Sequence, residues 1–568
     1  MSSSSKIYQH VIPDIENWPI FRLSEDRRSF VAEVQEFTVQ RLLEHGTPEV
    51  TDMLSKTVFQ ERVRIKEEPW KVDPPNERQF WRRIRKRLIQ HSLDAPNEEA
   101  TQNNEEILQL IVNRYAEEIV GTFRIGTFLF ARRFLTLFFT RLLNTAAGGS
   151  LFGSKYRLQD RLLVTGRTEA VRGLFAKGTV VVVPTHFSNL DSILIGFAMD
   201  SFAGLPSFSY GAGLNLYNTG YTAYFMNRLG AYRVDRRKKN PIYLETLKSM
   251  SNLSIQRGTN SLFFPGGTRS RSGALETKLK MGLLGTVVEA QRALYEKGEN
   301  TKIFVVPAIL GYHFVLEAPY LVEQYLRQVG KERYIKSQDA FYSVTQLLKF
   351  TWQFFSQSSD INVSFGQPMD VLGNPVDAEG MSYDQHGNPI DVREYFLGGE
   401  GVNEDLQRET EYTKILADRI VERYHKDNLV LSSHLVAFAA FQLLKRQNPR
   451  LDLYGILRLP VDEYIFSTEA LTDVVGQLQQ LLIELHTDGH IQLSDILYAT
   501  PEEIIQHGIR HLGAYHVDKP LRYNKAGEIV SDSFNLLFFY HNRLSTYGWE
   551  NHIQWRKRAM EEVAPGDD

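Results

Sequence analysis

The chain has 568 residues, of which 42% are hydrophobic and 23% are charged, and its formal net charge is −3. These proportions are typical of globular proteins, and the length indicates more than one domain. The near-neutral charge gives no reason to expect a nucleic-acid partner. The absence of cysteine excludes disulfides, cysteine-based zinc or iron–sulfur sites and an acyl-cysteine intermediate, and it fits a reducing cytoplasm.

Residues 1–150 are predicted to form a helical N-terminal region. The segments SFVAEVQEFTVQRLLEHG and RQFWRRIRKRLIQHSL have apolar residues at helical spacing, and we expect the polar stretch DAPNEEATQNNEE to break the helical pattern. The N-terminus lacks the apolar core of a signal peptide. Because no run of about 20 uninterrupted apolar residues occurs, we expect no transmembrane helix.

The segment 125–143, IGTFLFARRFLTLFFTRLL, is the most apolar part of the chain. Arg132, Arg133 and Arg141 interrupt it, and Arg141 points roughly opposite Arg132 on a helical wheel. Two interpretations stay open. The helix packs under the next domain, or it lies in the plane of a membrane interface.

Between residues 151 and 428, strand-like and helical segments alternate. The runs VVVVP, SLFFP, KIFVVPAIL and INVSFG are predicted strands, separated by helical stretches such as NPIYLETLKSMSNLSIQRG. This alternation predicts an α/β domain with a mainly parallel central sheet flanked by helices, and ligands in such sheets bind at the carboxyl ends of strands. The block 370–410 is expected to be irregular, and residues 429–568 are expected to form a helical C-terminal accessory domain.

A histidine followed five residues later by an aspartate can take a proton from a hydroxyl when the two side chains meet. The pattern occurs at His186/Asp191, His386/Asp391 and His490/Asp495. Only the first pair follows a buried-looking strand, Thr179 to Val183, and precedes an apolar helix for which Ser188, Asn189 or Asp191 is an expected cap. Since a spacing of five does not align two side chains on one helix face, a turn must fold Asp191 back towards His186.

The two other pairs are predicted to be structural. The His386 pair lies in DQHGNPID, which indicates a surface turn. His490 precedes IQLSDILYAT, where Ser494 or Asp495 is expected to cap a helix start.

Two basic clusters follow the first pair along the chain. LGAYRVDRRKKN carries Arg233, Arg236, Arg237, Lys238 and Lys239, with Asp235 as the only acid among them. For Lys238 and Lys239 we expect a solvated surface. SLFFPGGTRSRSG carries Arg269 and Arg271 after a strand and a Gly-Gly turn, followed by Lys278 and Lys280, which predicts a phosphate site. The loop is not a P-loop, because no Gly-Lys-Ser/Thr closes it.

In this order, four blocks of the sequence resemble the glycerolipid acyltransferase superfamily. They are His186-Phe-Ser-Asn-Leu-Asp191, Gly230-Ala-Tyr-Arg-Val-Asp-Arg236, Phe264-Pro-Gly-Gly-Thr-Arg-Ser-Arg271 and Val305-Val-Pro-Ala308. GAGLNL, RSRSG and VPAILGYHFVLE, with a Gly-Tyr and a following Glu, are most similar to bacterial glycerol-3-phosphate 1-O-acyltransferases. The resemblance of motifs covers roughly residues 179–317.

The resemblance implies roles for residues in the matching blocks. His186 would be the general base, oriented by Asp191, for the sn-1 hydroxyl of glycerol 3-phosphate. That hydroxyl would attack an acyl thioester of acyl-carrier protein or acyl-CoA directly, to give lysophosphatidate. Arg236, Arg269, Arg271 and Lys280 would hold the phosphate, and Gly267, Thr268 and Ser270 would complete the loop around the substrate. No metal and no cofactor beyond the acyl donor is expected.

The product implies a lipid surface as a partner, so we expect peripheral attachment to the cytoplasmic face of the cell membrane. The third block departs from the family at Gly266, where a glutamate is usual, and Asp235 replaces a frequent arginine. Because of Gly266, the identity of the acyl acceptor stays open. Dihydroxyacetone phosphate and lysophosphatidate are the alternative acceptors for an acyltransferase. A non-catalytic lipid-binding protein of the same fold is the alternative outside this class.

Overall fold

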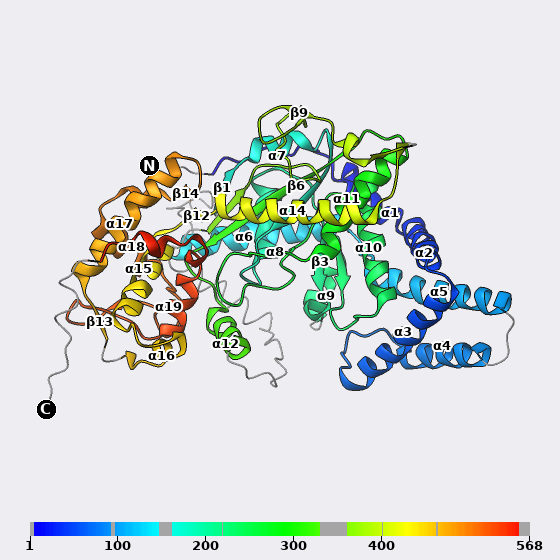
Figure 1. The fold of residues 1–568 in the computed structure, drawn as a ribbon, viewed down its shortest axis with the longest axis horizontal. Helices are drawn as coiled ribbons and strands as arrows, with labels where there is room; N and C mark the ends of the chain where they lie inside the picture. Colours follow the sequence, from blue (N-terminus) through cyan, green and yellow to red (C-terminus); the bar gives the residue numbers. More distant parts are fainter. Residues whose placement is uncertain are drawn as a thin grey trace.

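The computed structural model describes residues 5–92, 97–146, 162–217, 220–329, 361–399, 401–461 and 464–555. A seven-stranded sheet in the order β1-β7-β6-β2-β5-β3-β4 lies at its centre (Figure 1). Its strands are β1 (Leu162–Gly166), β2 (Gly178–Pro184), β3 (Ser209–Gly213), β4 (Ala231–Val234), β5 (Ser261–Leu262), β6 (Lys302–Tyr312) and β7 (Ile361–Phe365). Strands β2 to β6 run parallel, while β7 is antiparallel to β6 and parallel to β1. The predicted mainly parallel sheet is confirmed, with all four predicted strands in it.

Strand β2 lies in the middle of the sheet, and both of its faces are apolar. Val180 and Val182 pack against helix α8 (Asp191–Ser201) and the C-terminal helices, whereas Val181 and Val183 pack against helices on the other face. Alternate side chains of a strand point to opposite faces, so an unbroken valine run fits a strand covered on both sides. The carboxyl end of β2 therefore opens at the middle of the sheet edge.

Helices connect and cover the strands. They are α7 (Thr168–Leu174), α8, η3 (Leu214–Tyr217), α9 (Gly220–Met226), α10 (Pro241–Gln256), α11 (Met281–Glu296), α12 (Ala318–Val329) and α14 (Leu406–Lys426). The predicted irregular block contains the short pieces β8 (Ser382–Tyr383), β9 (Pro389–Ile390), η4 (Val392–Phe396), β10 (Leu397–Gly398) and β11 (Gly401–Val402).

The N-terminal region is helical, as predicted; α2 to α5 lie at one end of the molecule, whereas α6 lies beside the central sheet (Figure 1). The region contains η1 (Ile15–Asn17), α1 (Pro19–Glu25), α2 (Arg27–Leu43), α3 (Thr47–Glu67), α4 (Glu77–Ser92), α5 (Asn97–Ile119) and α6 (Ile125–Ala146). The expected break at DAPNEEATQNNEE is wrong from Asn97 onward, because α5 runs through it. Two of its asparagines are buried and hydrogen-bonded to neighbouring helices: Asn104 donates to Thr51, and Asn103 accepts from Arg87.

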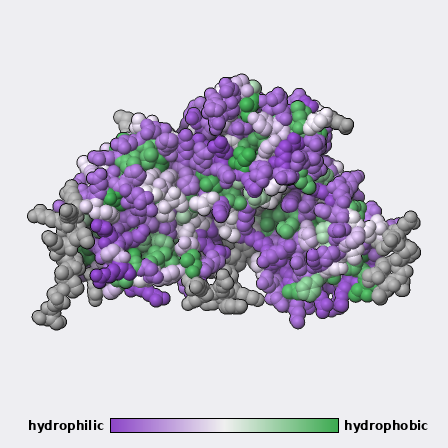
Figure 2. Space-filling model, in the orientation of Figure 1, coloured by the Kyte–Doolittle hydropathy of each residue, from purple (hydrophilic) through white to green (hydrophobic). Residues whose placement is uncertain are grey.

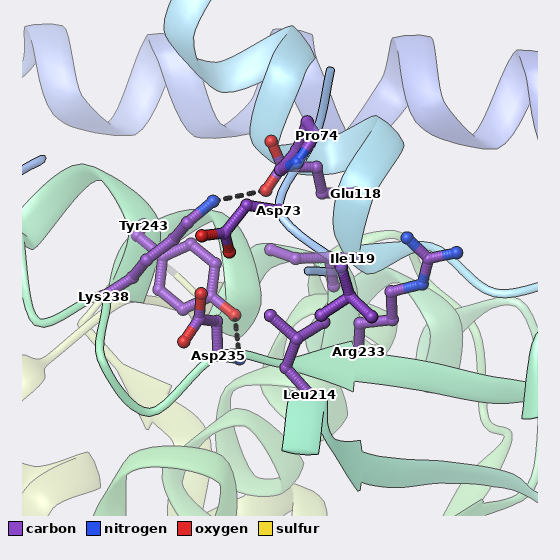
Figure 3. Close-up of a pocket in the computed structure, with 10 residues that line it drawn as sticks. Asp73, Pro74, Glu118, Ile119, Leu214, Arg233, Asp235, Lys238 and Tyr243 are labelled. Atoms are coloured by element: carbon purple, nitrogen blue, oxygen red, sulfur yellow. Dashed lines mark hydrogen bonds and ion pairs between the residues drawn. The ribbon is translucent and has the colours of Figure 1, made fainter. Parts of the chain in front are cut away.

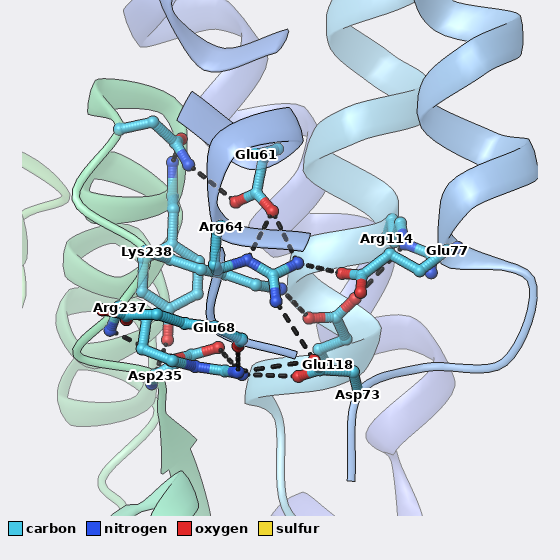
Figure 4. A network of polar contacts seen from close by, with 12 residues as sticks. Glu61, Arg64, Glu68, Asp73, Glu77, Arg114, Glu118, Asp235, Arg237 and Lys238 are labelled. Carbon is cyan, nitrogen blue, oxygen red and sulfur yellow. Dashed lines mark hydrogen bonds and ion pairs between the residues drawn. The ribbon is translucent and has the colours of Figure 1, made fainter. Parts of the chain in front are cut away.

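A buried network of charges joins the N-terminal helices to the turn after β4 (Figure 4). Arg237 donates to both carboxylate oxygens of Asp235 and to Asp73, and Lys238 pairs with Glu118. The expectation of a solvated Lys238 is wrong: it is 4% exposed, whereas Lys239 is exposed. Asp73 and Glu118, unlike Asp235, come from more than 100 residues earlier, so the local sequence did not show them.

Next to this network lies a cavity of about 20 Å³, lined by residues that include Asp73, Leu214, Arg233 and Lys238 (Figure 3). This volume holds about one water molecule, which is too little for a phosphorylated substrate. None of its lining residues belongs to the loops around His186. The second block thus contributes mainly to the attachment of the N-terminal helices.

Residues beyond 428 lie at the opposite end of the molecule from α2–α5 (Figure 1). The elements are β12 (Leu429–Val430), α15 (Ser432–Gln447), α16 (Leu453–Leu457), β13 (Ile465–Phe466), α17 (Thr468–Thr487), β14 (Gln492–Leu493), η6 (Asp495–Tyr498), α18 (Pro501–His511), β15 (Arg522–Tyr523), β16 (Ile529–Val530), α19 (Phe534–His541), η7 (Ser545–Tyr547) and η8 (Trp549–His552). Their apolar side chains share one hydrophobic cluster with β2 and α8. The division of the chain at 150 and 428 stays a prediction.

Helix α6 confirms the predicted helix in the segment 125–143 and packs only one side on the protein. Arg132 holds it to α8 by donating to both carboxylate oxygens of Asp200, at 2.8 and 2.6 Å. The side chain of Arg141 lies outside the described part of the structure. Leu129, Phe130, Phe134 and Leu137 are 44–59% exposed. Among the described residues, no helix is long and apolar enough to cross a membrane. On the face drawn in Figure 2, hydrophobic residues form separate patches within a mostly hydrophilic surface.

Candidate active site

His186 and Asp191 meet at the carboxyl end of β2, as predicted. Asp191 Oδ2 lies 2.8 Å from His186 Nδ1. Because an ionised carboxylate only accepts hydrogen bonds, this contact assigns the proton to Nδ1 and leaves the lone pair on Nε2. The turn closes with a hydrogen bond from Asp191 N to Ser188 O, which folds the aspartate back towards the imidazole. The histidine side chain keeps 17% of its surface exposed, so it is accessible to a small substrate.

The Asp191 carboxylate is fully buried and accepts four hydrogen bonds. Besides His186, the main-chain N–H groups of Phe187 and Ser188 donate to Oδ2, at 2.6 and 2.9 Å. The hydroxyl of Tyr312, at the end of β6, donates to Oδ1 at 2.6 Å. These donors compensate the cost of burying a charge. Neither Ser188 nor Asn189 caps α8, contrary to expectation: the helix begins at Asp191, and the Ser188 hydroxyl accepts from Leu190 N instead.

The third block packs directly on His186. The Phe264 ring lies over the imidazole, with 4.2 Å between ring centroids and 27° between planes. Ser270 N donates to the carbonyl of His186 at 2.8 Å, and the Ser270 hydroxyl donates to Ala274 O. The main chain of the histidine is therefore fixed by the same loop that carries the predicted phosphate-binding arginines.

Glu317 links the first block to Arg269. This buried carboxylate accepts hydrogen bonds from the Ser188 hydroxyl at 3.0 Å and from Asn189 N at 2.8 Å. Arg269 Nη1 lies 3.4 Å from its Oε1. A guanidinium has five N–H donors, so this single contact leaves Arg269 able to bind an anion beside His186.

The other predicted phosphate ligands of the third block point in different directions. Lys280 folds back over the Gly-Gly turn, where a Cβ on Gly267 would lie 2.6 Å from Lys280 Nζ. Gly267 has φ +75°, so this position needs glycine for its backbone and for the close approach. Arg271 leans outward and donates to Gln328 on α12 at 2.9 Å. Thr268 is half-buried on the same turn.

Arg236 is exposed on the turn after β4. Strand β4 is three positions from β2 in a sheet whose strands are about 4.8 Å apart, so the two ends are separated by roughly 14 Å. Arg236 thus lies at the same edge of the sheet but further from His186 than Arg269 does. Among the predicted phosphate ligands, Arg269 is the one that a shared partner, Glu317, joins to the turn between His186 and Asp191.

The two other His-Asp pairs lie on the surface. His386 is exposed in the turn between β8 and β9, and Asp391 caps η4 by accepting from Arg393 N. His490 is exposed, and Ser494 stands at the N-cap of η6, although its side chain makes no capping hydrogen bond. Both were predicted to be structural. In the described part of the chain, no cluster of His, Asp or Glu could hold a metal ion.

Sequence reasoning missed several residues that support the site. Tyr312 and Glu317 stand in the quoted segment VPAILGYHFVLE, but nothing local assigned them a partner in the first block. Glu276, which accepts a hydrogen bond from His186 N at 2.9 Å, lies in an unremarkable stretch after the third block. Arg543 comes from beyond α19, and its guanidinium lies 4.2 Å from the centre of the Phe187 ring. Contacts across such sequence distances give no local pattern.

Comparison with known proteins finds similarity in the part of the chain that carries the site. Residues 161–311 match the family model described as Acyltransferase. The glycerol-3-phosphate acyltransferase of Alteromonas mediterranea is 26% identical over 45% of this chain. That of Aeromonas hydrophila is 28% identical over 42% of it, and that of Pseudoalteromonas atlantica is 26% identical over 49%. The matches span 27–30% of the length of those relatives.

A solved structure, the 1-acyl-sn-glycerophosphate (LPA) acyltransferase PlsC of Thermotoga maritima, aligns with 66% of this chain and 93% of its own. The identity is 14% and the TM-score is 0.25, which is too low to support an argument.

Replacing Tyr312 by phenylalanine removes one of the four donors to a buried carboxylate. A hydrogen bond to a charged group contributes about 1.5–3 kcal/mol, so we expect the free energy of unfolding of Tyr312→Phe to fall by about 2 kcal/mol in urea titrations. The matched control is Tyr454→Phe, whose hydroxyl donates to a neutral carbonyl, Leu326 O, at 3.1 Å; it should lose about 1 kcal/mol or less. Equal losses in the two variants would contradict a special role for the Tyr312–Asp191 contact.

Proposed function

Because residues 161–311 match the family model described as Acyltransferase, we propose that the protein is a glycerol-3-phosphate O-acyltransferase. It transfers a fatty acyl group from acyl-carrier protein or acyl-CoA to the sn-1 hydroxyl and yields lysophosphatidate. The observation that carries this proposal is the His186 imidazole, fixed through Nδ1 by buried Asp191, next to a loop with a partly accessible arginine. The relatives named glycerol-3-phosphate acyltransferase support this choice of acceptor.

In this mechanism His186 Nε2 takes the proton of the acceptor hydroxyl as its oxygen attacks the thioester carbonyl carbon. A C–O bond forms, the C–S bond breaks, and the thiolate leaves with the proton that His186 has held. Asp191 stabilises the imidazolium formed in between, and its four hydrogen-bond donors fix the carboxylate in place. The chain has no cysteine, which excludes an acyl-cysteine, and the direct attack needs no covalent enzyme intermediate.

The phosphate of the acceptor would bind beside the third block. Arg269 is the best placed ligand, because Glu317 fixes it beside the turn that carries His186. Lys280 lies over Gly267 and contributes a second positive charge on the same turn. Arg271, which contacts Gln328 on α12, and Arg236, further along the sheet edge, would act on the approaching anion or on the donor phosphates. Gly267, Thr268 and Ser270 would form the wall of this subsite.

Peripheral attachment to the cytoplasmic face of the membrane is the second part of the proposal. Phe130, Phe134 and Leu137 lie three, four or seven positions apart on α6, which puts their exposed side chains on one face of the helix, and exposed Leu129 lies at the border of that face. Arg133 is exposed among them. An apolar face bordered by cations fits a helix that lies in the interface of an anionic lipid layer, where a lysophosphatidate product leaves.

Removal of the base should abolish turnover without unfolding the protein. With labelled glycerol 3-phosphate and either acyl-CoA or acyl-carrier protein, we expect His186→Ala to reduce kcat at least about 10²–10⁴-fold, the usual contribution of a positioned base. His386→Ala, from an exposed pair of the same spacing, is the control and should keep full activity. Near-normal turnover of His186→Ala would contradict the mechanism. Transfer only to dihydroxyacetone phosphate or lysophosphatidate would change the acceptor.

Removal of the proposed phosphate ligand should act mainly on acceptor binding. We expect Arg269→Ala to raise the KM for glycerol 3-phosphate about 10–100-fold, because a charge-assisted hydrogen bond contributes about 1.5–3 kcal/mol. The KM for the acyl donor should stay unchanged. Exposed Arg28 on α2 provides the control Arg28→Ala. An effect confined to the donor KM would show that Arg269 binds the thioester substrate instead.

The exposed face of α6 should determine membrane binding. In flotation with vesicles that contain anionic lipid, we expect the double variant Phe130→Glu/Phe134→Glu to bind at least about tenfold more weakly than the unaltered protein, since each buried aromatic ring contributes about 1.5–3 kcal/mol. Phe59→Glu, on α3 and 67% exposed, is the control. Equal flotation of all three proteins would place the membrane contact elsewhere.

A further inference from the structure

Glu276 reaches His186 from the far end of the third-block loop. Its Oε1 accepts a hydrogen bond from His186 N at 2.9 Å, while Ser270 N donates to the carbonyl of the same histidine. The main chain of His186 is therefore held on both sides by one loop. The second oxygen of Glu276, Oε2, is buried and accepts no hydrogen bond from the described residues. Such an oxygen is costly to bury, which argues for a use beyond packing.

Gly266 provides the space that this carboxylate occupies. A Cβ on Gly266 would lie 3.1 Å from Glu276 Cγ and 3.3 Å from Oε1. The backbone of Gly266 has no positive φ, unlike that of Gly267, so the conformation alone does not require glycine there. The steric demand comes from Glu276. The two residues thus form a matched pair, in which the position that lacks a side chain accommodates a carboxylate supplied from ten residues later.

The groups that face Glu276 come from other parts of the fold. Asp191, at the start of α8, disfavours a second negative charge at this place. Tyr424, on α14, stays neutral, because burial and the charge of Glu276 raise the pKa of its hydroxyl. Buried Arg543, held by hydrogen bonds to Leu310 O at 2.8 Å and to Asn428, favours the negative charge on Glu276. Burial is the largest influence and raises the pKa of Glu276 to about 7, against the opposing effect of the His186 N–H.

We propose that Glu276, admitted by Gly266, is the positioning residue that holds the His186 main chain so that the imidazole faces the acceptor hydroxyl. This inference rests on the proposed function, because it concerns the same base. The ionised carboxylate accepts the His186 N–H more strongly than the neutral acid does. The active form therefore has Glu276 ionised, and its contribution is present at higher pH and lost as the pH falls through about 7.

Moving the carboxylate from position 276 to position 266 tests whether the two residues form a matched pair. Gly266→Glu alone should crowd Glu276, and Glu276→Gly alone should leave His186 N without its acceptor; each should lower kcat about tenfold, as expected for the loss of one charge-assisted hydrogen bond. The double variant Gly266→Glu/Glu276→Gly returns a carboxylate to the loop and should recover most of this loss. The control is Glu299→Gln, an exposed glutamate, with full activity. Additive losses in the double variant would overturn the pairing.

The pH profile separates positioning from simple packing. In Glu276→Gln the amide oxygen still accepts the His186 N–H but does not titrate. We expect a smaller loss of kcat than in Glu276→Gly, an unchanged KM for glycerol 3-phosphate, and a shallower dependence of log kcat on pH between about 6 and 8. A profile with the same slope as that of the unaltered protein would overturn the role of the ionised carboxylate.

A measurement without turnover keeps this inference distinct from the proposed function. We expect His186 to react with diethyl pyrocarbonate at least about threefold faster in Glu276→Gly than in the unaltered protein, as followed by peptide mass spectrometry, because the released imidazole becomes more exposed. The melting temperature of each variant shows that it is folded. If the unaltered protein transfers no acyl group, the proposed function is wrong. The rates of reaction with diethyl pyrocarbonate still test whether Glu276 positions His186. Equal reaction rates would overturn the positioning role.

Discussion

The burial of the Asp191 carboxylate is the constraint on which the rest of the site depends. A charge without solvent needs donors from the protein, and here they come from the imidazole, two main-chain N–H groups and the Tyr312 hydroxyl. To supply them, the chain after β2 must turn back on itself, and β6 must extend far enough along the sheet to bring Tyr312 beside that turn. The orientation of the base is therefore a property of the sheet, since neighbouring strands of the sheet deliver both partners.

A second layer of acids fixes the loops against one another. Glu317 joins the first block to Arg269, and Glu276 joins the third block to the main chain of His186. Each carboxylate accepts from main-chain N–H groups, which do not depend on side-chain identity. Position 266, where the resembled superfamily usually has a glutamate, is a glycine here, and a carboxylate from another place in the loop, that of Glu276, lies against it.

The strands and the first pair were predictable because their signals are local. A valine run marks a strand covered on both faces, and the sequence context distinguished His186 from His386 and His490. The surroundings of Lys238 were not predictable, because its partner Glu118 is 120 residues away and its burial depends on how α5 docks. The same holds for Asn97 onward, where tertiary contacts of buried asparagines outweigh their low helix propensity. Arg543 left no signal at all, since a lone arginine near the end of a chain has many uses.

The position of Arg543 has a consequence for how freely the parts of this chain can be exchanged. Its guanidinium is buried within the acyltransferase-like region, where it lies over Phe187 and donates to the end of β6, although it belongs to the last fifteen residues that the structure describes. A protein divided at 428 would retain every residue of the four sequence blocks and still lose the cation that offsets two buried carboxylates. The C-terminal segment is in this sense a part of the electrostatics around His186 and Asp191, and an exchange of either half of this chain would have to keep both together.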